Sequence, residues 1–380
     1  MFGPTGAGKS THLALIAAQL RRYEGMSIYC FDKGMSMYPL TKAVGGKHFS
    51  VAADDDSLAF CPLQFLETKG DRAWALEWIS TIIELNNSTI TPAQRNEISN
   101  AITNMHRSGA KTLSEFVVTI QDDSIRDVLA QYTIDGMMGH LLDAENDGLT
   151  LSSFTTFEIE ELMNLGQKYA LPTLLYLFRR IERDLHGQPA AIILDEAWAI
   201  FKNKIFQAII DEWLRKIAKK NVFLVIASTQ INDVLKSDIF DVLIDNCKTT
   251  ILLPNPEATK PYISEIYQKF GLNEKQIELI AYAVPQRDYY YMSSLGCRMF
   301  NLKLGEIALT FLGRASITDI KRARELKQQY GDLFGYYWLK EFGHNEFAEI
   351  WTGNVPVRSR NVPVRSGNVP TITSEEESHA

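Results

Sequence analysis

Gly3-Pro4-Thr5-Gly6-Ala7-Gly8-Lys9-Ser10 matches the pattern G-x-x-x-x-G-K-[ST] at every position. In such a loop, glycines let backbone N–H groups approach phosphate oxygens closely, and the helix that follows adds its positive end. Lys9 supplies a point charge to the same oxygens, and the hydroxyl of Ser10 is a ligand for Mg²⁺. We therefore expect a phosphate-binding site made of Gly3, Pro4, Thr5, Gly6, Ala7, Gly8, Lys9, Ser10 and Thr11.

The sequence on either side of this loop is uneven. Residues 11–20 read as the expected helix, but only Met1 and Phe2 precede the first glycine, where a buried strand is normal. We therefore expect the strand that leads into the loop to be largely missing from this chain, and a whole N-terminal domain with it.

Apolar runs that end in polar residues predict the sheet that carries this loop. Residues 190–194 are followed by Asp195 and Glu196, residues 222–227 by Ser228, Thr229 and Gln230, and residues 249–253 by Pro254 and Asn255. Residues 26–31 and 47–51 are further strands near the loop. Continuous apolar strands separated by helical stretches predict a mostly parallel sheet buried on both faces, with ligands at its carboxyl ends.

Two segments differ from this α/β pattern. Between about residues 70 and 145 the sequence is more polar and helical, with helix starts at Thr91-Pro92 and at Thr112, which predicts an all-α insertion. The segment Asn354-Val355-Pro356-Val357-Arg358-Ser359 recurs at residues 361–366, which predicts a flexible tail. The resulting division is an opening segment of a P-loop domain over residues 1–69, the insertion over 70–145, the rest of the P-loop domain over 146–351, and the tail over 352–380.

Composition limits the class of protein. A hydrophobic content of 46% predicts a folded, soluble chain, and 39 basic against 46 acidic residues argue against a globally basic nucleic-acid binder. Four scattered cysteines without a CxxC pair favour a reduced intracellular compartment. No apolar run approaches the roughly 18–20 residues of a membrane span.

The carboxylates after residues 190–194 predict nucleotide hydrolysis. Asp195 is placed to hold Mg²⁺ together with Ser10, and Glu196 to polarise an attacking water. Because a kinase that transfers phosphate to a hydroxyl does not need this second acid, the pair favours ATP hydrolysis over phosphotransfer. Gln230, at the end of the next strand, is placed to touch the γ-phosphate and report its loss.

Two arginines are candidates for a finger that reaches across a subunit boundary and neutralises transition-state charge, namely Arg215 and Arg287. For each, a solvated helix face or a local ion pair is an equally good interpretation. Lys216, Lys219 and Lys220 form a basic run that is either a solvated helix face or a contact with a polyanion such as DNA.

Several motifs together resemble the CagE/TrbE/VirB family of conjugative type IV secretion ATPases over about residues 3–315. In chain order they are Gly3 to Ser10, Phe31-Asp32-Lys33-Gly34, Phe157 to Leu162, Leu175 to Glu182, Leu194 to Trp198, Ser228-Thr229-Gln230, Leu253 to Ala258 and Arg287 to Tyr290. The repeat tail after residue 351 has no counterpart in the resemblance.

The resemblance implies a RecA-like motor domain that binds ATP and Mg²⁺ and works as a homo-oligomer, either a hexamer or a dimer. It also implies association with other secretion channel components at the cytoplasmic face of the bacterial inner membrane, through partners or the missing N-terminal domain. Such proteins energise pilus assembly and the transfer of DNA or protein. By the same resemblance, Lys9 and Ser10 belong to the nucleotide loop, Asp195 and Glu196 are the metal and water carboxylates, Gln230 is the sensor, and Arg215 or Arg287 is the finger.

Two other functions fit the same motifs. A ring-forming, DNA-translocating coupling ATPase shares the loop, the Asp-Glu pair and the glutamine, although the net charge of −7 argues against it. A nucleotide-binding structural subunit with little turnover of its own is the second alternative.

Overall fold

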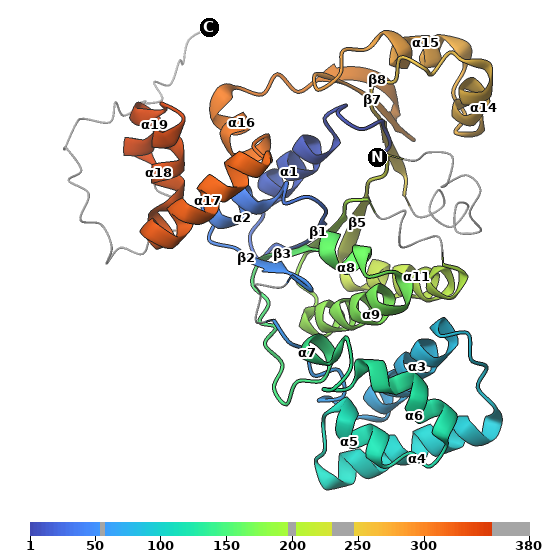
Figure 1. Ribbon diagram of the computed structural model, residues 1–380. Helices are drawn as coiled ribbons and strands as arrows, with labels where there is room; N and C mark the ends of the chain where they lie inside the picture. The colour runs from blue at the N-terminus through green and yellow to red at the C-terminus, as the bar shows by residue number, and fades with distance from the viewer. Residues whose placement is uncertain (54–57, 197–202, 230–246, 352–380) are drawn as a thin grey trace, which may run out of the picture.

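The computed structural model describes residues 1–53, 58–196, 203–229 and 247–351 (Figure 1). The predicted tail at residues 352–380 and the predicted sensor Gln230 lie outside the described residues.

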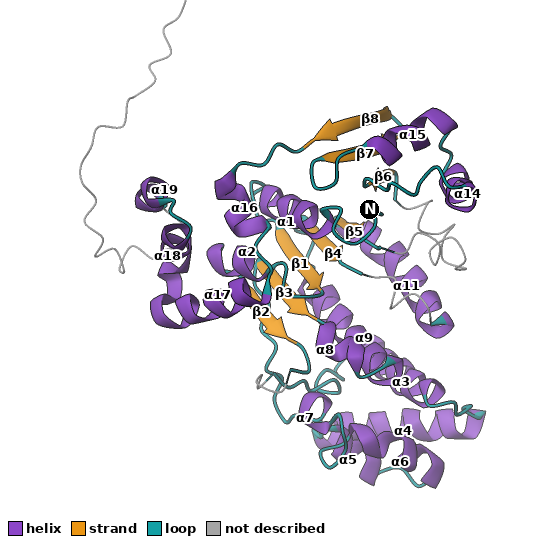
Figure 2. Cartoon of the chain, turned by 45° about the horizontal axis from the view of Figure 1, so that its top comes forward, coloured by secondary structure: helices purple, strands orange, loops and turns teal. Residues whose placement is uncertain are grey.

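A parallel sheet with the strand order β2-β3-β1-β4-β5 forms the centre of the molecule (Figure 2). Its strands are β1 (Ser27–Asp32), β2 (Lys47–Ser50), β3 (Phe154–Glu158), β4 (Ala190–Leu194) and β5 (Val222–Ile226). β1 pairs with β3 and β4, β2 pairs with β3, and β5 pairs with β4. The predicted parallel sheet is therefore confirmed.

Both faces of this sheet are covered by helices. Tyr29 and Phe31 of β1 belong to the core that contains α9 (Gln167–Asp184), whereas Ile28 and Cys30 belong to the core that contains α1 (Lys9–Leu20). Since side chains alternate across a strand, β1 is buried from both sides. The cartoons show α1 and α2 (Tyr38–Ala43) on one face, and α8 (Glu160–Asn164), α9 and α11 (Lys204–Ile217) on the other (Figures 1 and 2).

A smaller sheet with the order β6-β7-β8 follows along the chain, made of β6 (Thr249–Leu252), β7 (Asp288–Ser293) and β8 (Gly296–Asn301). The sequence predicts residues 249–253 as a strand of the parallel sheet, and this is wrong because β6 pairs antiparallel with β7. An apolar run identifies a buried strand but not its partner. Helices α14 (Pro261–Lys269) and α15 (Glu274–Tyr282) share a core with Leu252 and Tyr290 of this sheet.

The first two residues join the two sheets. Phe2 forms parallel bridges to Ser228, just after β5, and to Leu252 of β6. The N-terminal amine of Met1 donates to the carbonyl oxygen of Ile226 at 2.7 Å, and the N–H of Leu253 donates to the carbonyl oxygen of Phe2 at 2.8 Å. Met1 and Phe2 therefore lie at the end of the strand position that leads into the phosphate-binding loop.

The all-α insertion of the predicted fold is confirmed. Its helices are α3 (Lys69–Leu85), α4 (Pro92–Ser108), α5 (Leu113–Val118), α6 (Asp123–Leu129), the 3₁₀ turn η1 (Ala130–Tyr132) and α7 (Gly139–Leu142). The predicted helix starts are confirmed by capping boxes, in which Thr91 pairs with Gln94 and Thr112 with Glu115. The division of the chain at residues 69 and 145 stays a prediction.

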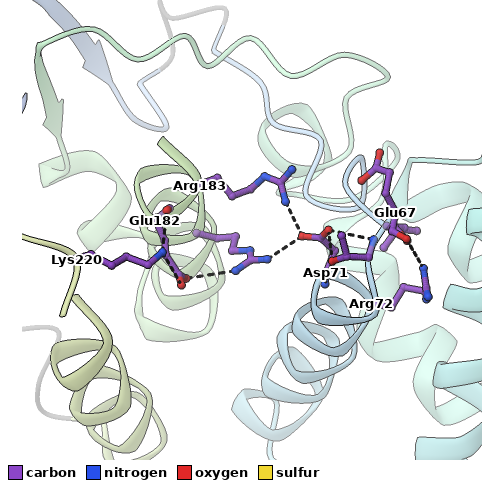
Figure 3. Close-up of polar contacts among 9 residues, drawn as sticks. Glu67, Asp71, Arg72, Glu182, Arg183 and Lys220 are labelled. Atoms are coloured by element: carbon purple, nitrogen blue, oxygen red, sulfur yellow. Dashed lines mark hydrogen bonds and ion pairs between the residues drawn. The ribbon is translucent and has the colours of Figure 1, made fainter. Parts of the chain in front are cut away.

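Charged side chains join the insertion to the helices of the central sheet (Figure 3). Asp71, in the first turn of α3, accepts from Arg179 of α9 at 2.8 Å and from Arg183 of α9 at 2.5 Å. Glu182 lies 3.3 Å from Arg179 and 3.4 Å from Lys220, which belongs to the 3₁₀ turn η2 (Ala218–Lys220) before β5. We call these five residues the insertion ion cluster.

The described chain ends in four helices, α16 (Glu306–Leu312), α17 (Ile317–Tyr330), α18 (Phe334–Glu341) and α19 (Asn345–Ile350), with the 3₁₀ turn η3 (Gly331–Leu333) between α17 and α18. They lie beside α2 (Figure 1), and Phe334 and Trp338 share a core with Tyr38 of that helix. This packing brings the linker between α16 and α17 to the phosphate-binding loop. None of the described helices is both long and apolar enough to cross a lipid bilayer.

Candidate nucleotide site

The loop before α1 turns tightly at two glycines. Gly6 and Gly8 have φ values of 81° and 100°, a region that side chains rarely adopt. A Cβ on Gly8 would lie 2.7 Å from the hydroxyl of Tyr289, and one on Gly3 would lie 2.4 Å from the Cβ of Leu253. These glycines are therefore required by the packing of the loop itself, in addition to any need of a ligand.

Lys9 and Ser10, the first residues of α1, meet the carboxylates that follow β4. The ammonium of Lys9 lies 3.2 Å from Asp195 and donates a hydrogen bond to Glu196. The hydroxyl of Ser10 donates to Asp195 at 3.1 Å. The hydroxyl of Thr229, after β5, donates to Glu196 at 3.1 Å. The structure thus brings together four of the side chains that the sequence assigns to phosphate, metal and water.

The two carboxylates have different environments. Asp195 is only 2% exposed, and burial raises its pKa although Lys9 lowers it to some extent. Glu196 is partly exposed and has a left-handed backbone with φ 49°, which is costly for a side-chain residue. Its N–H donates to the carboxylate of Asp195 at 3.0 Å. The turn therefore keeps one acid buried beside Ser10 and presents the other to the cavity.

These side chains line a cavity of about 1090 Å³. Of the predicted loop residues, Pro4, Thr5, Gly6, Gly8, Lys9, Ser10 and Thr11 line it. Gly3 and Ala7 are buried beneath the loop. Basic residues outnumber acidic ones among the described charged side chains of its wall, which are Lys9, Lys33, Arg287, Lys303, Arg314, Asp195, Glu196 and Asp319.

The two finger candidates lie in different places. Arg287 lines the cavity. Arg215, on α11, is exposed and forms an ion pair with Asp211 at 3.0 Å, one of the alternatives left open by the sequence. In the same helix Lys216 pairs with Glu212 at 2.7 Å. Gln230 cannot be placed, but its neighbour Thr229 lines the cavity.

Residues that the sequence does not single out hold the loop from the side of β7. Gln286, with φ 65°, donates its N–H to the carbonyl oxygen of Ala7 at 2.9 Å and its side-chain amide to that of Gly6 at 3.1 Å. The hydroxyl of Tyr289 donates to the carbonyl oxygen of Gly8 at 3.2 Å. The only available signal was the position of Gln286 and Tyr289 beside Arg287, because no spacing rule links residues so far from the loop.

His12 supports α1 from inside the protein. Its ring packs edge-on against Tyr289 with the centroids 4.5 Å apart, and its Nδ1 is buried without a hydrogen-bond partner among the described residues. Burial lowers the pKa of His12 to about 4, so this side chain is neutral at pH 7.

The donor set fits Mg²⁺ bound to a nucleotide. The hydroxyl of Ser10 and the carboxylate of Asp195 are hard oxygen ligands, and Mg²⁺ typically takes one or two protein oxygens together with phosphates and water. Within the described residues no group of three or more His, Cys, Asp or Glu side chains is arranged to hold a metal ion. A metal at Ser10 and Asp195 therefore requires the phosphates as further ligands.

The sequence is similar to conjugal transfer proteins. Residues 113–289 match the TraG P-loop domain. The chain is 47% identical over 354 residues to a probable conjugal transfer protein TrbE of Sinorhizobium fredii, a match that covers 92% of this chain and 54% of that protein. It is 48% identical to the conjugal transfer protein TrbE of Rhizobium radiobacter, over 90% of this chain and 43% of that protein. This chain therefore spans about half the length of these curated relatives.

More distant similarities extend to VirB4 proteins and to solved structures. Protein virB4 of Agrobacterium fabrum is 26% identical over 90% of this chain and 44% of its own length. The structure of VirB4 of Thermoanaerobacter pseudethanolicus has a TM-score of 0.66 at 15% identity, over 81% of this chain and 90% of that chain. The plasmid coupling protein TrwB in complex with ADP and Mg²⁺ has a TM-score of 0.54 at 14% identity, over 80% of this chain and 85% of that chain. At these identities, the structural matches establish a shared fold.

Proposed function

The chain belongs to the family of TrbE and VirB4 proteins, and from this membership and the geometry of its cavity we propose that it is an ATP-hydrolysing motor subunit of a bacterial type IV secretion or conjugation system. The membership confirms the resemblance predicted from the ordered motifs. In this proposal the motor energises pilus assembly and the transfer of DNA or protein.

One observation carries the proposal. Lys9 and Ser10 of the loop contact Asp195 and Glu196 at the carboxyl end of β4, inside a cavity of about 1090 Å³. The loop therefore offers donors to phosphate at the same place where the strand offers one carboxylate to a metal and one to water. Hydrolysis of a nucleoside triphosphate needs these three functions together.

The charge of the cavity wall supports a triphosphate with its metal. Five basic and three acidic side chains among the described lining residues leave an excess of two positive charges. Mg²⁺ bound to ATP carries about two negative charges, because the metal offsets half of the charge of the triphosphate. A wall of this charge neutralises the ligand.

Each side chain has a role in the proposed site. Lys9 exchanges its carboxylate partners for β- and γ-phosphate oxygens when nucleotide binds. Ser10 and Asp195 hold Mg²⁺, which supplies charge neutralisation between these phosphates. Glu196 orients the attacking water, and Thr229 holds the carboxylate of Glu196 by the hydrogen bond described above.

Assembly and surroundings belong to the same proposal. We propose a homo-oligomer, a hexamer or a dimer, that meets other channel components at the cytoplasmic face of the inner membrane. Gln230 acts as the sensor of the γ-phosphate. Arg287 or Arg215 is the finger, and a subunit mixture tests it, since Arg287→Ala subunits regain activity with Lys9→Ala subunits only if the two residues act on opposite sides of one interface.

A coupling ATPase that moves DNA is the second candidate, because the fold is shared with the plasmid coupling protein TrwB. The identities of 47% and 48% to TrbE proteins favour the first candidate. Single-stranded and double-stranded DNA stimulate turnover several-fold if the second candidate is correct, and leave it unchanged if the first is correct.

The experiment that tests the proposal is ATP turnover of this chain with Mg²⁺ and with excess chelator, measured beside its melting temperature with and without ATP. We expect turnover with Mg²⁺ alone, and a melting temperature raised by the nucleotide. A raised melting temperature with background turnover indicates a nucleotide-binding structural subunit. If ATP changes neither quantity, the assignment of the loop is wrong.

A further inference from the structure

Lys33 is a cavity residue to which the proposed chemistry gives no role. It follows the last residue of β1, Asp32, and its exposed side chain lines the same cavity as Lys9. Within the described residues, Lys33 forms no ion pair or side-chain hydrogen bond. Most other charged groups on that wall have a partner, as Lys9 has in Glu196.

The backbone around Lys33 is fixed by two buried carboxylates. Asp32 is fully buried and accepts from the hydroxyl of Ser36 at 2.6 Å and from the N–H of Met37 at 2.7 Å. Glu158, at the end of β3, accepts from the N–H groups of Gly34 and Met35 at 3.1 and 2.6 Å. The N–H of Glu160 donates to Glu158 as well, at 3.0 Å.

This arrangement is expensive. Asp32 and Glu158 are direct neighbours in the β1–β3 register, and two buried carboxylates repel one another. Met35 has φ 62°, a left-handed conformation that costs free energy for a residue with a side chain. Such a cost is typical of a segment whose geometry serves a ligand, and the side chain that this loop presents to the cavity is that of Lys33.

The position of β1 decides which end of a nucleotide Lys33 reaches. β1 pairs in parallel with β4, so Phe31 lies opposite Leu194. The N–H of Asp195 donates to the carbonyl oxygen of Phe31 at 2.9 Å. Lys33 therefore leaves the sheet beside Asp195 and Glu196, the side of the cavity that holds the metal and the attacking water.

We infer that Lys33 binds the terminal phosphate of the nucleoside triphosphate, an inference that rests on the proposed function. The ammonium donates to a γ-phosphate oxygen, opposite Lys9, and distinguishes the triphosphate from the diphosphate. Asp32 and Glu158 are positioning residues that hold the loop.

The test compares the affinities of Lys33→Ala for a non-hydrolysable ATP analogue and for ADP, both with Mg²⁺, by calorimetric titration of the full chain. Since a hydrogen bond between charged groups contributes about 1.5–3 kcal/mol, we expect the analogue to bind roughly ten- to a hundredfold more weakly while ADP binding is unchanged. Lys33→Arg restores some of the affinity for the analogue. Lys275→Ala, at a well-exposed lysine of α15, is the matched control and changes neither affinity.

Two outcomes overturn the inference and leave the proposed function intact. In one, both ligands bind Lys33→Ala as they bind the unmodified chain, while Lys9→Ala loses both. In the other, Lys33→Ala weakens both ligands equally, which is the result of a distorted loop. If Lys9→Ala also binds both ligands normally, the proposed function fails, and the inference fails with it.

Discussion

The candidate nucleotide site and the insertion ion cluster both bury an aspartate against basic side chains, yet the pKa values of the two aspartates move in opposite directions. For Asp195, burial raises the pKa, and Lys9 offsets only a fraction of that effect. For Asp71, burial also acts to raise the pKa, but hydrogen bonds from Thr68 and Arg179 outweigh it, and the pKa lies below its usual value. One buried carboxylate is well satisfied, and the other is not.

The partners explain the difference. Asp71 takes hydrogen bonds from the side chain of Thr68 and from Arg179 and Arg183, and these donors belong to helices packed against one another. Asp195 shares its main cation, Lys9, with Glu196, and all three line an open cavity. A cluster with a surplus of fixed donors stabilises a fold, whereas a cluster with a surplus of acid is ready to exchange partners with a metal and phosphates.

The sharpest separation of the two regions comes from Lys9→Ala. We expect ATP affinity to fall roughly a hundredfold or more, because Lys9 donates charged hydrogen bonds to the phosphates. The melting temperature without nucleotide changes little, because Lys9 serves the ligand more than the fold. Calorimetric titration and thermal unfolding give the two values. A large drop in the melting temperature with normal ATP affinity would reverse the roles of the two clusters.

Glu196→Gln tests whether the exposed acid of the site acts on water. We expect ATP affinity to persist while turnover falls about 10²–10⁴-fold, the contribution typical of a general base. Steady-state turnover at saturating ATP and Mg²⁺ measures the effect. Glu212→Gln is the control, since Glu212 is an exposed residue of α11 paired with Lys216. Turnover of Glu196→Gln close to that of the control would assign the water to another residue.

The insertion ion cluster predicts the opposite phenotype. Asp71→Ala removes a helix cap and a buried partner of two arginines, so we expect the free energy of unfolding to fall by about 2–4 kcal/mol. Because the folded-state pKa of Asp71 lies below the unfolded value, its stabilisation is present above about pH 4 and is lost as the pH falls through the folded value.

Urea unfolding at pH 7 and near pH 3 measures both statements, with Glu77→Gln as the control. Glu77 forms an exposed ion pair with Arg95, so its substitution costs at most about 1 kcal/mol. ATP affinity of Asp71→Ala stays normal under conditions where the variant is folded. A variant as stable as the control at pH 7 would mean that the cluster does not hold the insertion to the sheet.

The sequence predicts the loop, the carboxylates and the parallel sheet because each depends on local spacing. Lys9, Ser10, Asp195 and Glu196 follow from a motif and an apolar run, and the structure brings them together. Other features could not be predicted. The pairing of β6 with β7 depends on long-range contacts.

The contact of Gln286 with the loop likewise joins residues 280 positions apart, and no pattern marks it. The approach of the linker between α16 and α17 to the cavity depends on the packing of Trp338 and its neighbours against α2. The sequence therefore predicts the chemistry of one wall of the site and not the elements that complete the cavity.

The smallest expected effect concerns Asp32, which extends the comparison to a third buried aspartate. Burial, together with the neighbouring Glu158, raises the pKa of Asp32 to about 8. The folded protein therefore binds a proton that the unfolded chain releases near pH 4, so this group makes the free energy of unfolding fall as the pH rises from about 4 to 8. This sign is opposite to that of Asp71.

Asp32→Asn imitates the protonated carboxyl and removes this slope. Between pH 6 and 7, we expect the stability of the variant relative to the unmodified chain to rise by less than about 1.4 kcal/mol, the limit for one proton per pH unit. Urea unfolding at both pH values measures it, and Asp332→Asn, at an exposed aspartate, gives no such change. Equal slopes for the unmodified chain and Asp32→Asn would mean that Asp32 is ionised in the folded protein, and that the loop carrying Lys33 is held by two full charges.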